Sequence, residues 1–189
     1  MRDPGTFARL ALASALLSAS ADGRAASNVD TGSPGNLATS VDLQFNITIP
    51  RFVSLRVGSA ASINTLSFAP TAAEMASSFP VLATGGDIGG SDVTVQVISN
   101  AGSVTLTAAT LTADLVSGGN TMPWSTLAAT NPTGSIIAPA FNTGSTVLTA
   151  GAGIVNQTGS WRYIWSNPPN TLYGAGTYTG TVRYTAATP

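Results

Sequence analysis

Several short runs of this chain alternate apolar with polar side chains. In residues 41–49 the apolar positions are Val41, Leu43, Phe45, Ile47 and Ile49. The same period of two recurs in residues 92–99 and 176–186. A period of two places every second side chain on the same face of an extended strand. We therefore expect each of these runs to be a strand with one buried face.

Turn-forming residues separate the apolar runs at intervals of roughly ten residues, which predicts about seven to nine short strands. The chain has 189 residues and is 43% hydrophobic, enough for one domain with its own core. We expect an all-β fold, an antiparallel two-sheet immunoglobulin-like sandwich over residues 40–189. Residues 71–79 alone have a helical composition. The turn Asn100-Ala101-Gly102 predicts a hairpin between residues 92–99 and 104–111.

The N-terminal segment has the pattern of a secretory signal. Arg2 and Arg9 precede a short apolar run, residues 10–21, which ends in the cleavage-like triplet Ala19-Ser20-Ala21. We expect a signal peptide over residues 1–21 and a flexible leader over 22–39, where turn-forming residues dominate. The predicted product is exported, to the cell surface, the extracellular space or a periplasm. No later run is long enough to predict a membrane span.

The composition excludes several functions. Only 8% of the residues are charged, the net charge is −1, and the chain contains no lysine, histidine or cysteine. A chain without a basic surface is a poor partner for nucleic acid. Without histidine or cysteine it has no catalytic triad, no cysteine–histidine dyad and no ordinary zinc site. We therefore expect no enzymatic activity and no cofactor.

Two groups of residues are candidate ligand sites. Asp87 and Asp92, in the glycine-rich stretch 85–92, carry hard oxygen ligands of the kind that Ca²⁺ prefers. Ordinary turn capping explains them better, so we expect no metal. Trp161, Tyr163 and Trp165 fall on one side of a predicted strand. They either stack on sugars or fill the core, and burial is favoured because large aromatic residues dominate sandwich cores.

Three stretches carry a family resemblance: PRFVSLRV, INTLSF and the ending AGTYTGTVRYTAATP. Together they resemble the immunoglobulin-like subunits of bacterial fimbriae, and the last strand is also similar to that of WxL-type surface domains. The chain contains neither a W-x-L triplet nor a cysteine pair. The resemblance implies self-association or association with related subunits, and a periplasmic chaperone as a further partner.

The expected function follows from this resemblance and from the missing catalytic groups. It is a non-catalytic structural or adhesive surface subunit, fimbria-like, that assembles by β-strand addition. Either the domain is self-complete, or residues 40–49 are the strand that it donates. The predicted assembly positions are Val41, Leu43, Phe45, Ile47, Ile49, Tyr178, Val182 and Tyr184. The alternative is a self-contained glycan- or surface-binding module that uses Trp161, Tyr163 and Trp165.

Overall fold

A computed structural model describes residues 27–32, 34–59 and 64–189. The chain divides into two units, Met1–Thr48 and Ile49–Pro189, and each is described by itself. The predicted signal peptide and the start of the predicted leader lie outside the described residues.

The described part of the first unit contains neither helix nor strand. Thr39 Oγ1 donates a hydrogen bond to the Asn28 carbonyl oxygen at 2.9 Å. The prediction of a strand with a buried face over residues 41–49 is wrong, because this segment forms no strand and its apolar side chains are exposed. Their exposed fractions are 55% for Val41, 75% for Leu43, 79% for Phe45, 85% for Ile47 and 74% for Ile49. An extended segment becomes a strand only when a partner strand pairs with it, and this segment has no ladder partner.

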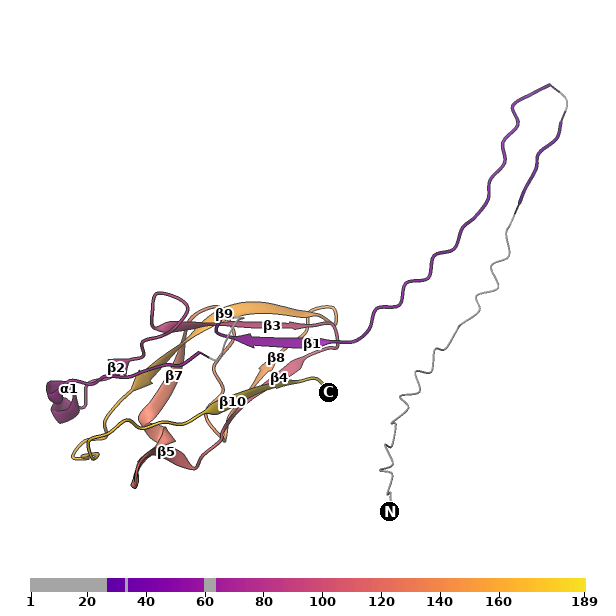
Figure 1. The fold of residues 1–189 in the computed structure, drawn as a ribbon. Helices are drawn as coiled ribbons and strands as arrows, with labels where there is room; N and C mark the ends of the chain where they lie inside the picture. Colours follow the sequence, from indigo (N-terminus) through magenta and orange to yellow (C-terminus); the bar gives the residue numbers. More distant parts are fainter. Residues whose placement is uncertain (1–26, 33, 60–63) are drawn as a thin grey trace, which may run out of the picture. The chain divides into compact units, whose positions relative to one another are not determined.

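The second unit contains two main antiparallel sheets, which form the two layers of Figure 1. In the larger sheet the order is β1-β3-β9-β2, and β7 pairs with the other side of β9. Its strands are β1 (Val53–Val57), β2 (Val81–Leu82), β3 (Asp92–Ser99), β7 (Leu127–Thr133) and β9 (Val155–Trp165). The smaller sheet has the order β10-β4-β8, with β4 (Val104–Thr110), β8 (Ser145–Leu148) and β10 (Val182–Ala187).

Three smaller elements complete the unit. Strands β5 (Asp114–Ser117) and β6 (Asn120–Pro123) form a two-stranded ribbon, followed by a single 3₁₀ turn, η1 (Trp124–Thr126). Helix α1 (Ala72–Ser77) lies within the predicted helical stretch. It begins with a capping box, in which Thr71 N donates to Glu74 Oε2 at 2.6 Å and Thr71 Oγ1 accepts from Glu74 N. Such reciprocal bonds satisfy main-chain donors that a helix start leaves unpaired.

The predicted hairpin between residues 92–99 and 104–111 is wrong. β3 pairs with β1 and β9, whereas β4 pairs with β10 and β8, so the two strands belong to different sheets. The Asn100 side chain ties this turn to the segment before β1, because it donates to the Pro50 carbonyl oxygen and accepts from Phe52 N. The turn therefore carries the chain from one layer to the other.

The core lies between the layers and is built from the alternating positions. Val93, Val95 and Val97 of β3 are 2%, 0% and 0% exposed, and they face Val104 and Leu106 of β4 within one cluster. A second cluster contains Val81, Leu115, Met122, Trp124 and Trp165. The predicted all-β, sandwich-like class is thereby confirmed. Among the described residues, no helix has the length and apolar character needed to cross a membrane.

The core position Leu106 gives a direct test of this packing. Leu106→Ala is expected to lower the free energy of unfolding by about 2–5 kcal/mol, because it removes a side chain that is only 1% exposed. Thr107→Ala, at the next and exposed position of β4, is the matched control and is expected to change it by less than about 0.5 kcal/mol. Urea unfolding monitored by circular dichroism measures both. Equal effects would contradict the assigned faces of β4.

Candidate functional site

Strand β1 is an edge strand with main-chain groups that no ladder satisfies. Among the described residues it lies at the end of its sheet and pairs with β3 alone. Gly58 N donates a hydrogen bond to the Thr94 carbonyl oxygen, and Asn100 N donates one to the Phe52 carbonyl oxygen. The even-numbered residues of β1 and its flanks therefore form the hydrogen bonds to β3. Antiparallel ladders alternate, so Val53, Leu55 and Val57 direct their N–H and C=O groups away from β3.

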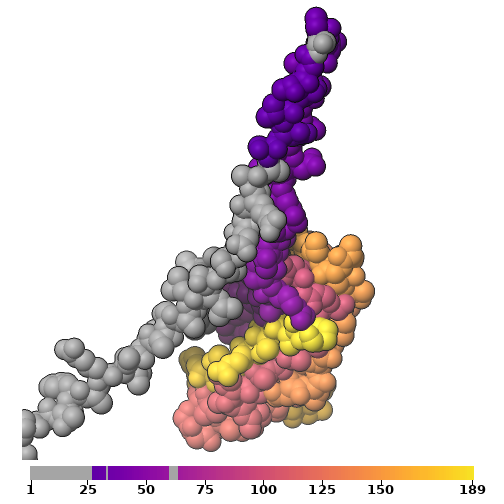
Figure 2. Space-filling model, turned by 90° about the vertical axis from the view of Figure 1, so that its right-hand side faces the viewer, coloured from indigo at the N-terminus to yellow at the C-terminus, as the bar shows by residue number. Residues whose placement is uncertain are grey.

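Strand β10 and the segment before it form a second open edge. Leu111 N donates to the Thr181 carbonyl oxygen, and Thr179 exchanges two hydrogen bonds with Val116. The odd-numbered residues therefore face the ribbon and β4. The even-numbered residues direct their main-chain groups to the open side; they are Tyr178, Gly180, Val182, Tyr184 and Ala186. Figure 2 shows the C-terminal segment, in yellow, along the surface of this unit.

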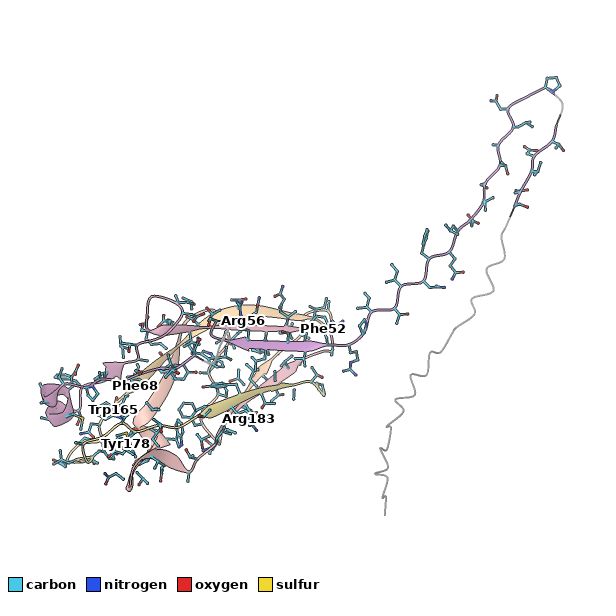
Figure 3. All side chains as sticks on the ribbon, viewed as in Figure 1. Phe52, Arg56, Phe68, Trp165, Tyr178 and Arg183 are labelled. Carbon is cyan, nitrogen blue, oxygen red and sulfur yellow. The ribbon has the colours of Figure 1, made fainter. Side chains whose placement is uncertain are left out.

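An apolar groove of about 1180 Å³ lies beside these edges. One wall is formed by Val57 and residues 64–70, and the other by residues 173–182 with Tyr184. Its floor includes Met75, Leu115, Met122, Trp124 and Phe141. In Figure 3, Phe68, Trp165 and Tyr178 lie in the same part of the sandwich. Small-molecule pockets have volumes of roughly 300–1,000 Å³, so this groove exceeds the usual size of a site for a compact ligand.

Gly180 lets the chain lie directly on the groove's aromatic floor. A Cβ atom at this position would meet the Trp124 ring at 2.5 Å and Leu115 Cδ2 at 2.8 Å. Trp124 also packs edge-on against Phe141, with ring centroids 5.6 Å apart. Any side chain at position 180 would therefore separate this edge from the floor.

The three aromatic residues of β9 are core residues in this structure. Trp161, Tyr163 and Trp165 are 0%, 7% and 4% exposed. The indole N–H of Trp161 donates to the Ile136 carbonyl oxygen at 2.8 Å, and that of Trp165 to Met122 Sδ at 3.2 Å. They therefore lie on the buried side of the strand, and Tyr163 and Trp165 also line the groove.

A pair of tyrosines links the two sheets beside the groove. The hydroxyl of Tyr163 on β9 lies 2.7 Å from that of Tyr184 on β10. The Tyr184 ring also packs against Trp161, with centroids 4.9 Å apart. Burial raises the pKa of Tyr184 to about 12. Burial, together with the neighbouring Tyr184, raises the pKa of Tyr163 further.

The two candidate calcium ligands make other interactions. Asp87 Oδ1 accepts a hydrogen bond from Thr94 N at 2.7 Å. Asp92 accepts two hydrogen bonds from Arg162, at 2.6 and 2.9 Å, and these lower the pKa of the Asp92 carboxyl. No cluster of three or more acidic, histidine or cysteine residues that could hold a metal occurs among the residues that the structure describes.

Some groove residues come from parts of the chain outside the alternating runs. Trp124, Phe141 and Met75 lie in a 3₁₀ turn, a loop and a helix, none of which alternates. Of the predicted assembly positions, Tyr178, Val182 and Tyr184 line the groove. The positions Val41, Leu43, Phe45 and Ile47 belong to the first unit, and Ile49 is the first residue of the second.

No protein-family model matches the chain, and neither a curated protein nor a solved structure matches it.

The tyrosine pair makes folding sensitive to alkaline pH. Tyrosines in the unfolded chain lose their protons near pH 10, whereas the buried pair keeps them to higher pH. The stability from this pair is complete below about pH 10 and is lost as the pH rises through about 12. Replacing both with Phe is expected to make this loss shallower in urea titrations between pH 8 and 11.5. An unchanged pH profile would contradict the role of the pair.

Proposed function

We propose that this chain is an exported, non-catalytic structural or adhesive surface subunit, fimbria-like, that assembles by β-strand addition. One combination of features supports the proposal. The chain has both an exposed alternating segment, residues 41–49, and an apolar groove beside two open strand edges. The segment is the donor and the groove is the acceptor. The partners are further copies of this chain or related subunits, and the family resemblance adds a periplasmic chaperone.

The acceptor side has both requirements for strand addition. Unpaired N–H and C=O groups at a sheet edge pair readily with an added strand, which gives affinity. The residues whose main chain points to the open side also direct their side chains inward: Leu55, Val57, Tyr184 and Ala186 pack against the first core cluster, and Val57 and Tyr184 also line the groove. A strand placed between these edges would bond to both main chains and cover the apolar interior at the same time.

The donor side has matching chemistry. Leu43, Phe45 and Ile47 are each at least 75% exposed, which is unfavourable in water. Burying a side chain of this kind contributes about 1.5–3 kcal/mol. The alternating residues Asp42, Gln44, Asn46 and Thr48 would remain on the outer face, where water solvates them.

A structural role also agrees with the chemistry of the described acidic residues. Glu74 caps α1, Asp87 holds the main chain of β3, and Asp92 is paired with Arg162. These carboxylates stabilise local structure, and none faces another acid across the groove.

Polar substitution of the donor segment tests the proposal. Leu43→Asn with Ile47→Asn is expected to weaken assembly by about 100-fold to 10,000-fold, because two apolar side chains no longer gain from burial. The matched control, Gln44→Ala with Asn46→Ala, changes the outer face and is expected to assemble normally. Electron microscopy and sedimentation of purified protein measure the result. Equal assembly of both variants, or discrete particles from the unmodified chain, would refute the proposal.

Truncation tests the acceptor side. Deleting residues 176–189 removes β10, whose six residues pair with β4, and one wall of the groove. The truncated chain is expected to lose its fold or its assembly, measured by circular dichroism and electron microscopy. A truncated chain that is fully folded and still forms filaments would show that this edge is not the acceptor.

A further inference from the structure

We propose a specific register for the added strand: Phe45 of a second copy of this chain lies opposite Val182 and anchors the donor in the groove. This inference rests on the proposed strand addition and specifies its partner and alignment. It assigns to Phe45, the one aromatic residue among the five apolar donor positions, the role of setting specificity.

The first argument is a match of length and period. The donor has apolar residues at 41, 43, 45, 47 and 49, and the acceptor edge directs its main chain outward at 178, 180, 182, 184 and 186. Both runs have nine residues, and each has position 45 or 182 at its centre. When the runs overlap completely, Phe45 lies opposite Val182 whether the donor runs parallel or antiparallel to β10. A shift of one residue would turn the apolar row outward, and a shift of two would leave one apolar side chain without cover.

The second argument is the local fit at Val182. This residue packs against the cluster that contains Trp124 and Trp165. Its neighbour Gly180 lies directly on this floor, because Trp124 and Leu115 fill the space that a side chain at position 180 would occupy. Aromatic side chains reach diagonal neighbours on the next strand, about 7–8 Å away. A ring opposite Val182 can therefore reach across the groove toward the edge-on pair Trp124 and Phe141, which line it together with Val182.

The third argument concerns the source of the donor. Residues 50–52 lead directly into β1, which itself forms one edge beside the groove. They are held there by hydrogen bonds: Asn100 Nδ2 donates to the Pro50 carbonyl oxygen, Phe52 N donates to Asn100 Oδ1, and Arg51 Nη2 donates to the Ala101 carbonyl oxygen. Because residues 50–52 are held in place, residues 41–49 have no linker in which the chain could reverse direction and lie beside its own β1. The same residues of a second copy can lie there without such a reversal.

The groove borders only part of the acceptor edge, because β1 and β10 already have Cα atoms within 8 Å of each other. Tyr178, Gly180, Val182 and Tyr184 line it, whereas Ala186 lies beyond its end. Near that end, Arg51 Nη2 lies 3.4 Å from the Pro189 carbonyl oxygen. Two strands that flank a third are separated by two strand spacings, about 9.6 Å. Seating the donor between them therefore requires β1 and β10 to separate to this distance.

Cysteine cross-linking tests the register, because the chain has no cysteine of its own. A full-length chain with Phe45→Cys is co-expressed with a differently tagged full-length chain with Val182→Cys. Opposed residues on neighbouring strands have Cα atoms about 4.5–5.5 Å apart, within the 4.4–6.8 Å range of a disulfide, whereas a shift of two residues exceeds that range. Leu43→Cys and Ile47→Cys are the matched donor controls, and circular dichroism verifies that Val182→Cys folds.

The expected result is a several-fold larger fraction of disulfide-linked dimer for the pair 45 and 182 than for 43 and 182 or 47 and 182, seen on non-reducing gels. A larger fraction for position 43 or 47 would overturn the register and leave strand addition intact. If none of the three donor variants forms a disulfide, the register is also overturned. Electron microscopy of the same samples would then show whether the chain still assembles, which tests strand addition independently of the register. A double variant, Phe45→Cys with Val182→Cys, that cross-links only within one chain would overturn the second copy as donor.

Discussion

The central constraint in this structure is the set of main-chain groups that point away from their own ladders at two strand edges. β1 and the segment that ends in β10 each have one paired side and one open side, and the open sides border the same apolar groove. An edge of this kind is a template for another strand, and proteins normally cover it, shorten it or charge it. Here the groove-facing residues of both edges are apolar or glycine, so little opposes an added strand.

The core stabilises this open arrangement from within. Trp161 is completely buried and bonded to the Ile136 carbonyl oxygen, and Tyr163 and Tyr184 connect the two sheets through their hydroxyls. These contacts keep β9 and β10 at a defined separation beside the groove. The same burial that places the β9 aromatic residues in the core therefore supports the walls of the groove, the proposed acceptor site.

Two runs with the same alternation have different environments. In β3 the valines are covered by β4 and paired on both sides by β1 and β9, whereas in residues 41–47 the apolar side chains remain exposed. Alternation states which residues share a face, but it contains no information on which strand covers that face. The hairpin expected at Asn100-Ala101-Gly102 failed for a related reason: the turn residues were recognised, but the partners of the two strands lie far away in the sequence.

The sequence by itself determined the strand-rich class, helix α1, the alternating faces of β3, β4 and β9, and the lack of histidine, cysteine and lysine. These properties are local, because they depend on the residue type and on its spacing to near neighbours. Only the tertiary structure decided which strands pair, which edges remain open, and that Trp124, Phe141 and Met75 line the same groove. The physical reason is that pairing and burial are contacts between residues distant in the chain, and a period of two is equally compatible with many such partners.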